Sequence, residues 1–335
     1  EIKAYKGPEY GSKDQVSYYL QKNDIKFVVT SNNNSKNYDI MNFLNNHGDG
    51  VKRFAFEVDN VENAFNHAVD NGAVPVQKTL KLEDENGYVE TASIKIYDDT
   101  EIVYVNYDNY KGLFMPSFGQ PVQKITIQNK ETGLKFVDHI VGNVRPNEMD
   151  MWVDYYSKTM DFERFIYFGP GDISTQYSSL LSSVVRSKDN TIKIPINEPY
   201  KGLRKSQIQE YIEEYNGSGV QHIAIATDDI ISSIAALREN GMEFLSVPDT
   251  YYEALKARNL VVSEDIDVLK KYGILLDFEG EGYLLQLFTK PISDRPTFFF
   301  EIIQRRKKSE GFGQGNFQSL FESIEQDQAL RGNLV

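Results

Sequence analysis

Hydrophobic and polar positions alternate in two distant segments of the chain that share one design. Residues 51–60 read VKRFAFEVDN and residues 220–229 read VQHIAIATDD, with apolar side chains at every second position, as in half-buried strands. Each segment is followed by helical spacing, over residues 61–71 and 230–240, that stops at Asn-Gly. Because glycine accepts the left-handed conformation that closes a helix, both halves of the chain are predicted to contain the same strand–helix unit.

The later half repeats a longer order of elements. VDHI at 137–140 matches VQHI at 220–223. A helical pattern and three apolar runs follow the first copy, at 149–160, 162–168, 177–185 and 191–196. A helix and three further runs follow the second copy, namely FLSV at 244–247, YLLQLFT at 283–289 and TFFFEIIQ at 297–304. The pattern predicts an α+β fold of four βαβββ modules, two in each half.

These repeats divide the chain into two domains joined by a linker. We predict an N-terminal domain over residues 1–115, a linker over 116–133 with several glycines and prolines, and a C-terminal domain over 134–335. EIKAYKG at 1–7 resembles ERFIYFG at 163–169, but nothing before it matches the strand and helix of 137–162. The first module therefore lacks its initial strand and helix, and we expect the natural protein to begin upstream.

The end of the chain predicts a helix behind a glycine-rich segment, GFGQGNF at 311–317. Phe317, Leu320, Phe321 and Ile324 have helical spacing, and Asn316 is the predicted N-cap. A lid hinged on glycines has this pattern, and so does a surface helix packed at the end of a domain.

Composition narrows the class of protein. The 335 residues are 40% hydrophobic and 25% charged, as in a soluble globular chain of two domains. The net charge of −13 argues against nucleic acid or a membrane surface as partner, and no apolar run approaches the ~18 residues of a membrane span. Cysteine is absent, which suits a cytoplasmic protein. The basic run Arg305-Arg306-Lys307-Lys308 is predicted to be a solvated turn.

Two of the four histidines occupy the same position in successive modules. His139 lies in VDHI and His222 in VQHI, so a pairing of these modules about a pseudo-twofold axis would bring the two imidazoles together. His47 and His67 lack this register and are predicted to lie on the surface.

The apolar strand TFFFEIIQ contains one carboxylate, Glu301. Alternation places Glu301 and Phe299 on one face of the strand, where an unpaired buried charge costs several kcal/mol. A cation would remove that cost, and so would a salt bridge to Arg295 or Arg305. Two histidines and one carboxylate are the usual ligands of a non-haem Fe(II) with open positions, and they also suit zinc.

Several long segments resemble one known family. VDHIVGNV, PINEP, KSQIQEYIEEYNGSGVQHIA, DRPTFFFEIIQR and GFGQGNFQSLFESIE are together similar to the 4-hydroxyphenylpyruvate dioxygenases of the vicinal oxygen chelate superfamily. The match covers the later half in order, and the first half resembles the non-catalytic half of that family. The resemblance implies half-barrels built from paired modules, a C-terminal lid helix, and one Fe(II) per chain held by His139, His222 and Glu301.

The resemblance also implies the substrates and the walls of the cavity. The family converts an aromatic 2-oxo acid, 4-hydroxyphenylpyruvate, and O2 to homogentisate and CO2 in tyrosine catabolism, commonly as homodimers or homotetramers. Substrate-contacting positions of the family match Ser182, Asn197, Gln207, Gln221, Gln286, Phe288, Phe299, Phe312 and Phe317. On an ideal strand Gln221 would point away from its neighbour His222, so its contact with substrate is expected to be indirect.

Three alternatives stay open on the sequence. Hydroxymandelate synthase uses the same substrate and metal, although Pro195-Ile196-Asn197 and the aromatic Phe317 favour the ring hydroxylase. A non-catalytic metal-binding protein of the same fold would be expected to have lost a ligand. A zinc hydrolase would use the same three side chains without O2.

Overall fold

The computed structural model describes residues 1–34, 37–122, 129–174, 179–258, 261–279, 281–307, 309–330 and 332. The strands of the first half are β1 (Ile2–Lys6), β2 (Gln15–Lys22), β3 (Ile25–Asn32), β4 (Arg53–Glu57), β5 (Pro75–Asp84), β6 (Gly87–Ile96) and β7 (Thr100–Asn106). Those of the second half are β8 (Leu134–Asn143), β9 (Glu163–Phe168), β10 (Ser179–Arg186), β11 (Lys193–Tyr200), β12 (Gly219–Thr227), β13 (Leu275–Glu279), β14 (Gly282–Phe288) and β15 (Phe299–Arg306).

The helices lie between these strands and at the end of the chain. Besides the short 3-10 helix η1 (Pro8–Tyr10), they are α1 (Tyr38–His47), α2 (Val61–Asp70), α3 (Met149–Met160), α4 (Gln207–Tyr215), α5 (Ile230–Glu239), α6 (Asp249–Ala257), α7 (Ile266–Tyr272) and α8 (Gln314–Leu330). Asn60 and Asp229 cap α2 and α5 through their side chains, and each helix is followed by a glycine with positive φ, Gly72 and Gly241. The two predicted strand–helix units are thus confirmed.

Among the described residues the strands form three sheets. Two lie in the first half, with strand orders β1-β2-β3 and β4-β7-β6-β5, and one eight-stranded sheet, β13-β14-β15-β12-β8-β11-β10-β9, takes up the second half. No ladder joins a strand before the predicted linker to one after it, which supports the proposed division at residues 116–133. The α+β class and its βαβββ modules are confirmed.

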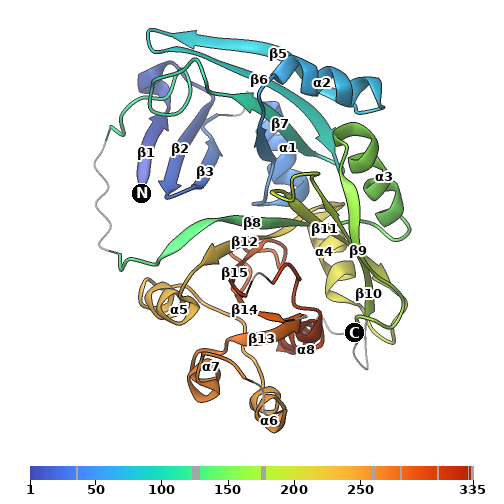
Figure 1. The fold of residues 1–335 in the computed structure, drawn as a ribbon. Helices are drawn as coiled ribbons and strands as arrows, with labels where there is room; N and C mark the ends of the chain where they lie inside the picture. Colours follow the sequence, from blue (N-terminus) through green and yellow to red (C-terminus); the bar gives the residue numbers. More distant parts are fainter. Residues whose placement is uncertain are drawn as a thin grey trace.

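The large sheet joins its two modules at their first strands. β8 and β12 run antiparallel at its centre, and β15 pairs in parallel with β12 on the far side. Figure 1 shows β8, β12 and β15 side by side, with the sheet curled and α8 lying beyond β14 and β13. These three adjacent strands carry the candidate metal ligands.

One continuous hydrophobic core extends through both halves. It contains Ile94 from β6, Tyr156 from α3 and Ile223 from β12, all buried. The hydroxyls of Tyr97 and Tyr156 meet at 3.2 Å inside it. The second-half sheet is therefore packed against the first half.

The module that contains His222 departs from the predicted strands. FLSV forms only an isolated bridge, Phe244 to Thr289, because Pro248 follows and cannot donate to a ladder. The missing strand is instead β13, which pairs with β14 through a tight hairpin. The helices α6 and α7 fill the long connection before β13, and the sequence patterns did not predict them.

Three further predictions are wrong. His47 is buried, since its Nδ1 lies 2.6 Å from the carbonyl oxygen of Tyr215 and its ring stacks on the Tyr215 ring. Asn316 lies inside α8, which begins at Gln314, and its side chain accepts a hydrogen bond from Tyr251 instead of capping the helix. Arg305 belongs to β15 and is largely buried in an ion pair instead of a solvated turn. His67 is exposed as predicted.

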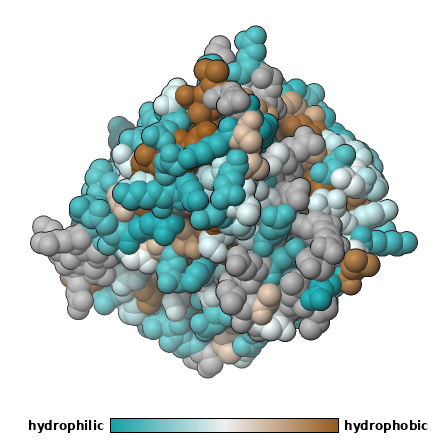
Figure 2. Space-filling view, turned by 90° about the horizontal axis from the view of Figure 1, so that it is seen from below, coloured by the Kyte–Doolittle hydropathy of each residue, from teal (hydrophilic) through white to brown (hydrophobic). Residues whose placement is uncertain are grey.

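The surface agrees with the acidic composition. On the face seen in Figure 2, hydrophilic residues predominate and hydrophobic ones lie in small separate groups. Within the described part of the chain, no helix combines the length and the apolar composition needed to cross a bilayer. The predicted cytoplasmic location and the homodimer or homotetramer stay predictions.

Candidate metal centre

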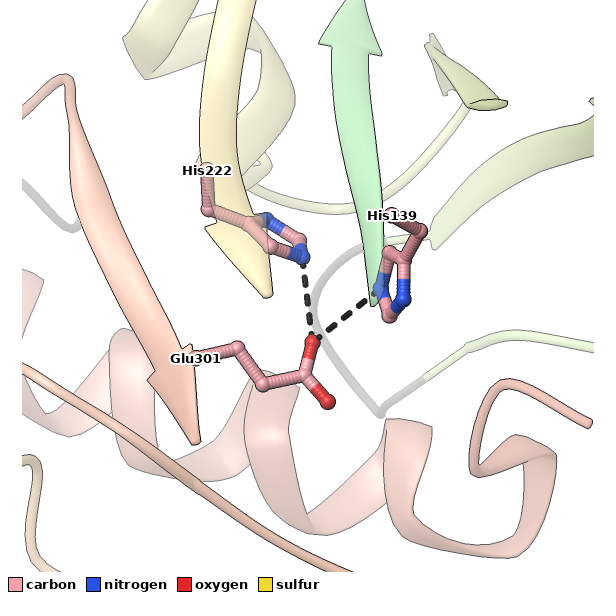
Figure 3. A group of neighbouring side chains, drawn as sticks. All are labelled: His139, His222 and Glu301. Carbon is pink, nitrogen blue, oxygen red and sulfur yellow. Dashed lines mark ion pairs between the residues drawn. The ribbon is translucent and has the colours of Figure 1, made fainter. Parts of the chain in front are cut away.

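His139, His222 and Glu301 lie on one face of three adjacent strands. Ala224 of β12 pairs in register with His139 of β8 on one side and with Glu301 of β15 on the other. Since side chains two positions apart share a face, His222 joins this row through Ala224. Glu301 Oε2 lies 3.3 Å from the Nε2 atom of each histidine, and all three side chains are buried (Figure 3). One potential ligand atom from each residue lies within 4.8 Å of the others.

The remaining nitrogen of each imidazole has an acceptor. Asp138 Oδ1 lies 2.7 Å from Nδ1 of His139, and Gln221 Oε1 lies 3.0 Å from Nδ1 of His222. Both acceptors require a proton on Nδ1, so each neutral ring directs the Nε2 lone pair at Glu301. Three electron-pair donors therefore face one another in a buried space. A cation satisfies all three at once, and the triad can hold a metal ion.

The charges of these groups follow from their neighbours. Burial alone would raise the pKa of Glu301, but the two imidazoles lower the pKa to about 2. Burial would lower the pKa of His139, yet Glu301 and Asp138 outweigh it and raise that pKa. Burial dominates at His222 and lowers its pKa. At neutral pH Glu301 is thus an anion and His222 is neutral, as metal ligands must be.

The salt-bridge alternative for Glu301 does not hold in the described structure. Arg305 pairs with Asp138, through Nε to Oδ2 at 2.8 Å and Nη2 to Oδ1 at 2.7 Å. Arg295 donates to the carbonyl oxygens of Asn46 and Glu214.

A cavity opens beside the triad, with about 530 Å³ of space between its atoms. Such a volume suits a small ligand. Six of the predicted substrate-contacting residues line it together with the triad, namely Ser182, Asn197, Gln207, Gln221, Phe288 and Phe312. Apolar residues that the sequence did not single out complete its walls, namely Val141, Phe168, Ile173, Leu180, Val184 and Pro195.

Three other predicted residues do not line the described cavity. Phe299 stacks on the ring of His222, at 4.8 Å between centroids and an angle of 19°. Gln286 is buried against Gly313, and its amide oxygen and nitrogen have no hydrogen-bond partner among the described residues. The side chain of Phe317 lies outside the described residues. The substrate roles of all nine residues stay predictions.

Gln221 lies on the same cavity as its neighbour His222, so the expectation of an indirect position is wrong. The register between β12 and β8 shifts at this point, from Val220 opposite Gly142 to His222 opposite Val141. The irregularity breaks the simple alternation of faces. It lets two consecutive side chains line one wall, and Gln221 also orients the His222 ring.

Two residues at the site had no clear signal in the sequence. Asp138 directly precedes His139, and Ala224 is the small residue between the ligands in the register. A carboxylate next to a strand histidine could have suggested the first. The second follows only from the strand pairing.

Comparisons with known proteins agree with this geometry. A family model described as the N-terminal part of hydroxyphenylpyruvate dioxygenase matches residues 10–115, and one for the glyoxalase, bleomycin resistance protein and dioxygenase superfamily matches residues 136–266. The 4-hydroxyphenylpyruvate dioxygenase of Xenopus tropicalis is 47% identical over 99% of this chain and 86% of its own. That of Dictyostelium discoideum is 44% identical over 99% of this chain and 92% of its own.

A solved structure of similar fold is a triple mutant of 4-hydroxymandelate synthase from Streptomyces coelicolor. It has a TM-score of 0.83 and 25% identity, and the match covers 97% of this chain and 90% of that one. The synthase is thus a more distant relative than the dioxygenases.

Paired βαβββ modules with a buried His-His-Glu cluster define a metal-binding protein of the glyoxalase and dioxygenase class. Within that class, identities of 44–47% over nearly the whole chain place this protein in one group. The chain belongs to the 4-hydroxyphenylpyruvate dioxygenase family, which confirms the resemblance noted in the sequence.

Proposed function

We propose that this chain is an Fe(II)-dependent dioxygenase that converts 4-hydroxyphenylpyruvate and O2 to homogentisate and CO2. Membership of the family supports the reaction, and the donor set supports the metal. The observation that carries the proposal is the arrangement of two Nε2 lone pairs around the buried Glu301 carboxylate, beside an open cavity. Two imidazoles and one carboxylate leave positions on Fe(II) for other ligands.

The lining of the cavity suits an anionic aromatic substrate held at a metal. None of the described lining residues is a lysine or an arginine. A 2-oxo acid therefore needs the charge of a bound metal ion as its electrostatic partner. Bound Fe(II) would supply a site for the 2-oxo acid and O2 and the redox chemistry between them.

The side chains of the cavity would position the substrate and exclude water. Phe288 and Phe312 supply flat apolar walls for an aromatic ring. Ser182, Asn197 and Gln207 offer hydrogen bonds to a ring hydroxyl or to the polar side chain of the substrate. Asp138 and Gln221 keep both imidazoles in the tautomer that presents Nε2.

Oxygen uptake and product chromatography test the proposal. The protein is incubated with Fe(II), ascorbate and 4-hydroxyphenylpyruvate, and the zinc-loaded protein is the control. We expect O2 and substrate to disappear in equal molar amounts with homogentisate as product, and no uptake with zinc. Hydroxymandelate as the main product would identify a synthase. No O2 uptake with Fe(II) bound would refute the dioxygenase.

A further inference from the structure

Four side chains next to the metal site form a closed ring of contacts. Asp138 Oδ1 accepts a hydrogen bond from Nδ1 of His139 at 2.7 Å. The His139 ring meets the edge of Phe312 with centroids 5.1 Å apart, and the guanidinium of Arg305 lies 5.7 Å from the centre of the Phe312 ring. Arg305 closes the ring by pairing with both oxygens of Asp138.

Arg305 also holds the backbone that leads into α8. Its Nη1 donates to the carbonyl oxygen of Gly311 at 2.5 Å, on the side of the guanidinium that Asp138 does not use. The neighbouring Phe312 lines the cavity beside the triad. One guanidinium thus binds the carboxylate behind a candidate metal ligand and the chain segment that closes the cavity over that ligand.

We propose that Arg305 is a positioning residue that couples the orientation of His139 to the placement of Gly311 and Phe312 over the cavity. A fixed Asp138 holds the His139 ring so that Nε2 faces the metal, and a fixed Gly311 holds Phe312 against the other face of the site. The coupling rests on the proposed function only in requiring that the triad bind a divalent metal.

The chemistry of the arginine explains why this position needs it. The planar fork offers donors in two directions, so Asp138 and Gly311 can be bound at the same time. The ammonium of a lysine is a single point and cannot reproduce both contacts. Side chains behind metal ligands commonly change metal affinity 10- to 100-fold when removed, so we expect an effect of about this size.

Metal affinity is the first measurement, and the chain offers a matched control. Arg306 is the next residue of β15, and it pairs with both a glutamate and solvent, since its Nε and Nη2 lie 3.0 and 2.8 Å from Oε1 of Glu264. Competition with a chelator gives the Co(II) affinity of Arg305→Met, Arg305→Lys and Arg306→Met. We expect a loss of about 10- to 100-fold in Arg305→Met, a similar loss in Arg305→Lys, and none in Arg306→Met. Equal affinities in all four proteins overturn the proposal.

Hydrogen exchange is the second measurement, and the unaltered protein alone suffices for it. Coupling between two sites is reciprocal, so Co(II) at the triad should slow amide exchange at residues 311–313. We expect this protection in the unaltered protein and in Arg306→Met, and its loss in Arg305→Met and Arg305→Lys. Exchange that is insensitive to Co(II) in the unaltered protein overturns the coupling even when a variant fails to fold.

The two measurements separate this proposal from the proposed function. If the unaltered protein binds neither Co(II) nor Fe(II), the metal centre itself is wrong and the coupling falls with it. If it binds Fe(II) and makes homogentisate while Arg305→Met keeps full Co(II) affinity and full protection, only the role of Arg305 is wrong.

Discussion

Arg53 on β4 and Glu101 on β7 lie opposite each other in parallel register and form a two-point ion pair, Nε to Oε2 and Nη2 to Oε1, both at 3.0 Å. In the second half, the matching register joins His222 to Phe299. The residue two positions further along β7 is Val103, where β15 has Glu301. The first half therefore has a salt bridge near the place of the metal and a valine in place of its carboxylate.

This ion pair predicts a stabilising role that is independent of metal binding. In Arg53→Met the buried Glu101 keeps Lys52 and Ser93 as partners but loses two charged hydrogen bonds. Because the Arg53 side chain is 51% exposed, we expect the free energy of unfolding to fall by only about 1–2 kcal/mol. Urea denaturation measures the loss. Co(II) affinity should not change, and a weaker affinity would contradict the separation of the two halves.

Glu301→Ala should abolish turnover and weaken metal binding. The substitution removes the anionic member of the triad and leaves the two imidazoles in place. Since loss of a group behind a ligand already costs 10- to 100-fold in affinity, loss of a ligand should cost more than about 100-fold. Chelator competition and O2 uptake measure the two effects. Full activity in this variant would refute the assignment of Glu301.

Ala224 predicts a steric limit on the metal site. It is fully buried and lies between His139 and Glu301 in the register, so a larger side chain would enter the space that the metal needs. We expect Ala224→Leu to destroy Co(II) binding and to cost about 1–3 kcal/mol of stability through overpacking.

Ala226→Leu is the matched control for that substitution. Ala226 lies two positions along β12 on the same face, opposite Ile303 instead of a ligand. It should lose similar stability in thermal unfolding and keep Co(II) binding. Equal loss of binding in both variants would mean that general distortion of β12, and not filling of the site, is the cause.

The modules and the ligand triad could be predicted from sequence because each leaves a local pattern. Alternation, Asn-Gly helix ends and a histidine at one position of two repeats are all visible in short segments. The register of β8 and β12 then brings His139 and His222 to one face. For these features, local preference and tertiary structure agree.

The features that were missed depend on contacts between distant segments. Asp138 and Arg305 are 167 positions apart, and neither lies in a pattern that indicates the other. Gln221 reaches the cavity through a register shift, which depends on the pairing with β8. His47 is buried because Tyr215 and Asp99 surround it, although its own helix gives no sign of this. Single-sequence patterns do not contain such information.

Metal affinity should rise with pH through the titration of His139. Its pKa is raised above the ordinary value of 6.5, and the proton must leave before Nε2 can bind a metal ion. Below that raised pKa, affinity should therefore fall about tenfold for each unit of pH, and above it affinity should be constant. Glu301 is already ionised, with its pKa lowered to about 2, and the pKa of His222 is lowered, so neither adds to the slope near neutrality.

Chelator competition with Co(II) between about pH 5 and pH 8 measures this dependence. Asp138→Asn gives the control, because loss of the carboxylate beside Nδ1 removes one cause of the raised pKa of His139. The midpoint in this variant should move to lower pH, while the affinity at the upper limit falls through the weaker hold on the ring. A midpoint below the ordinary histidine value in the unaltered protein, or one that does not move in Asp138→Asn, would show that Asp138 and Glu301 do not control the charge of His139.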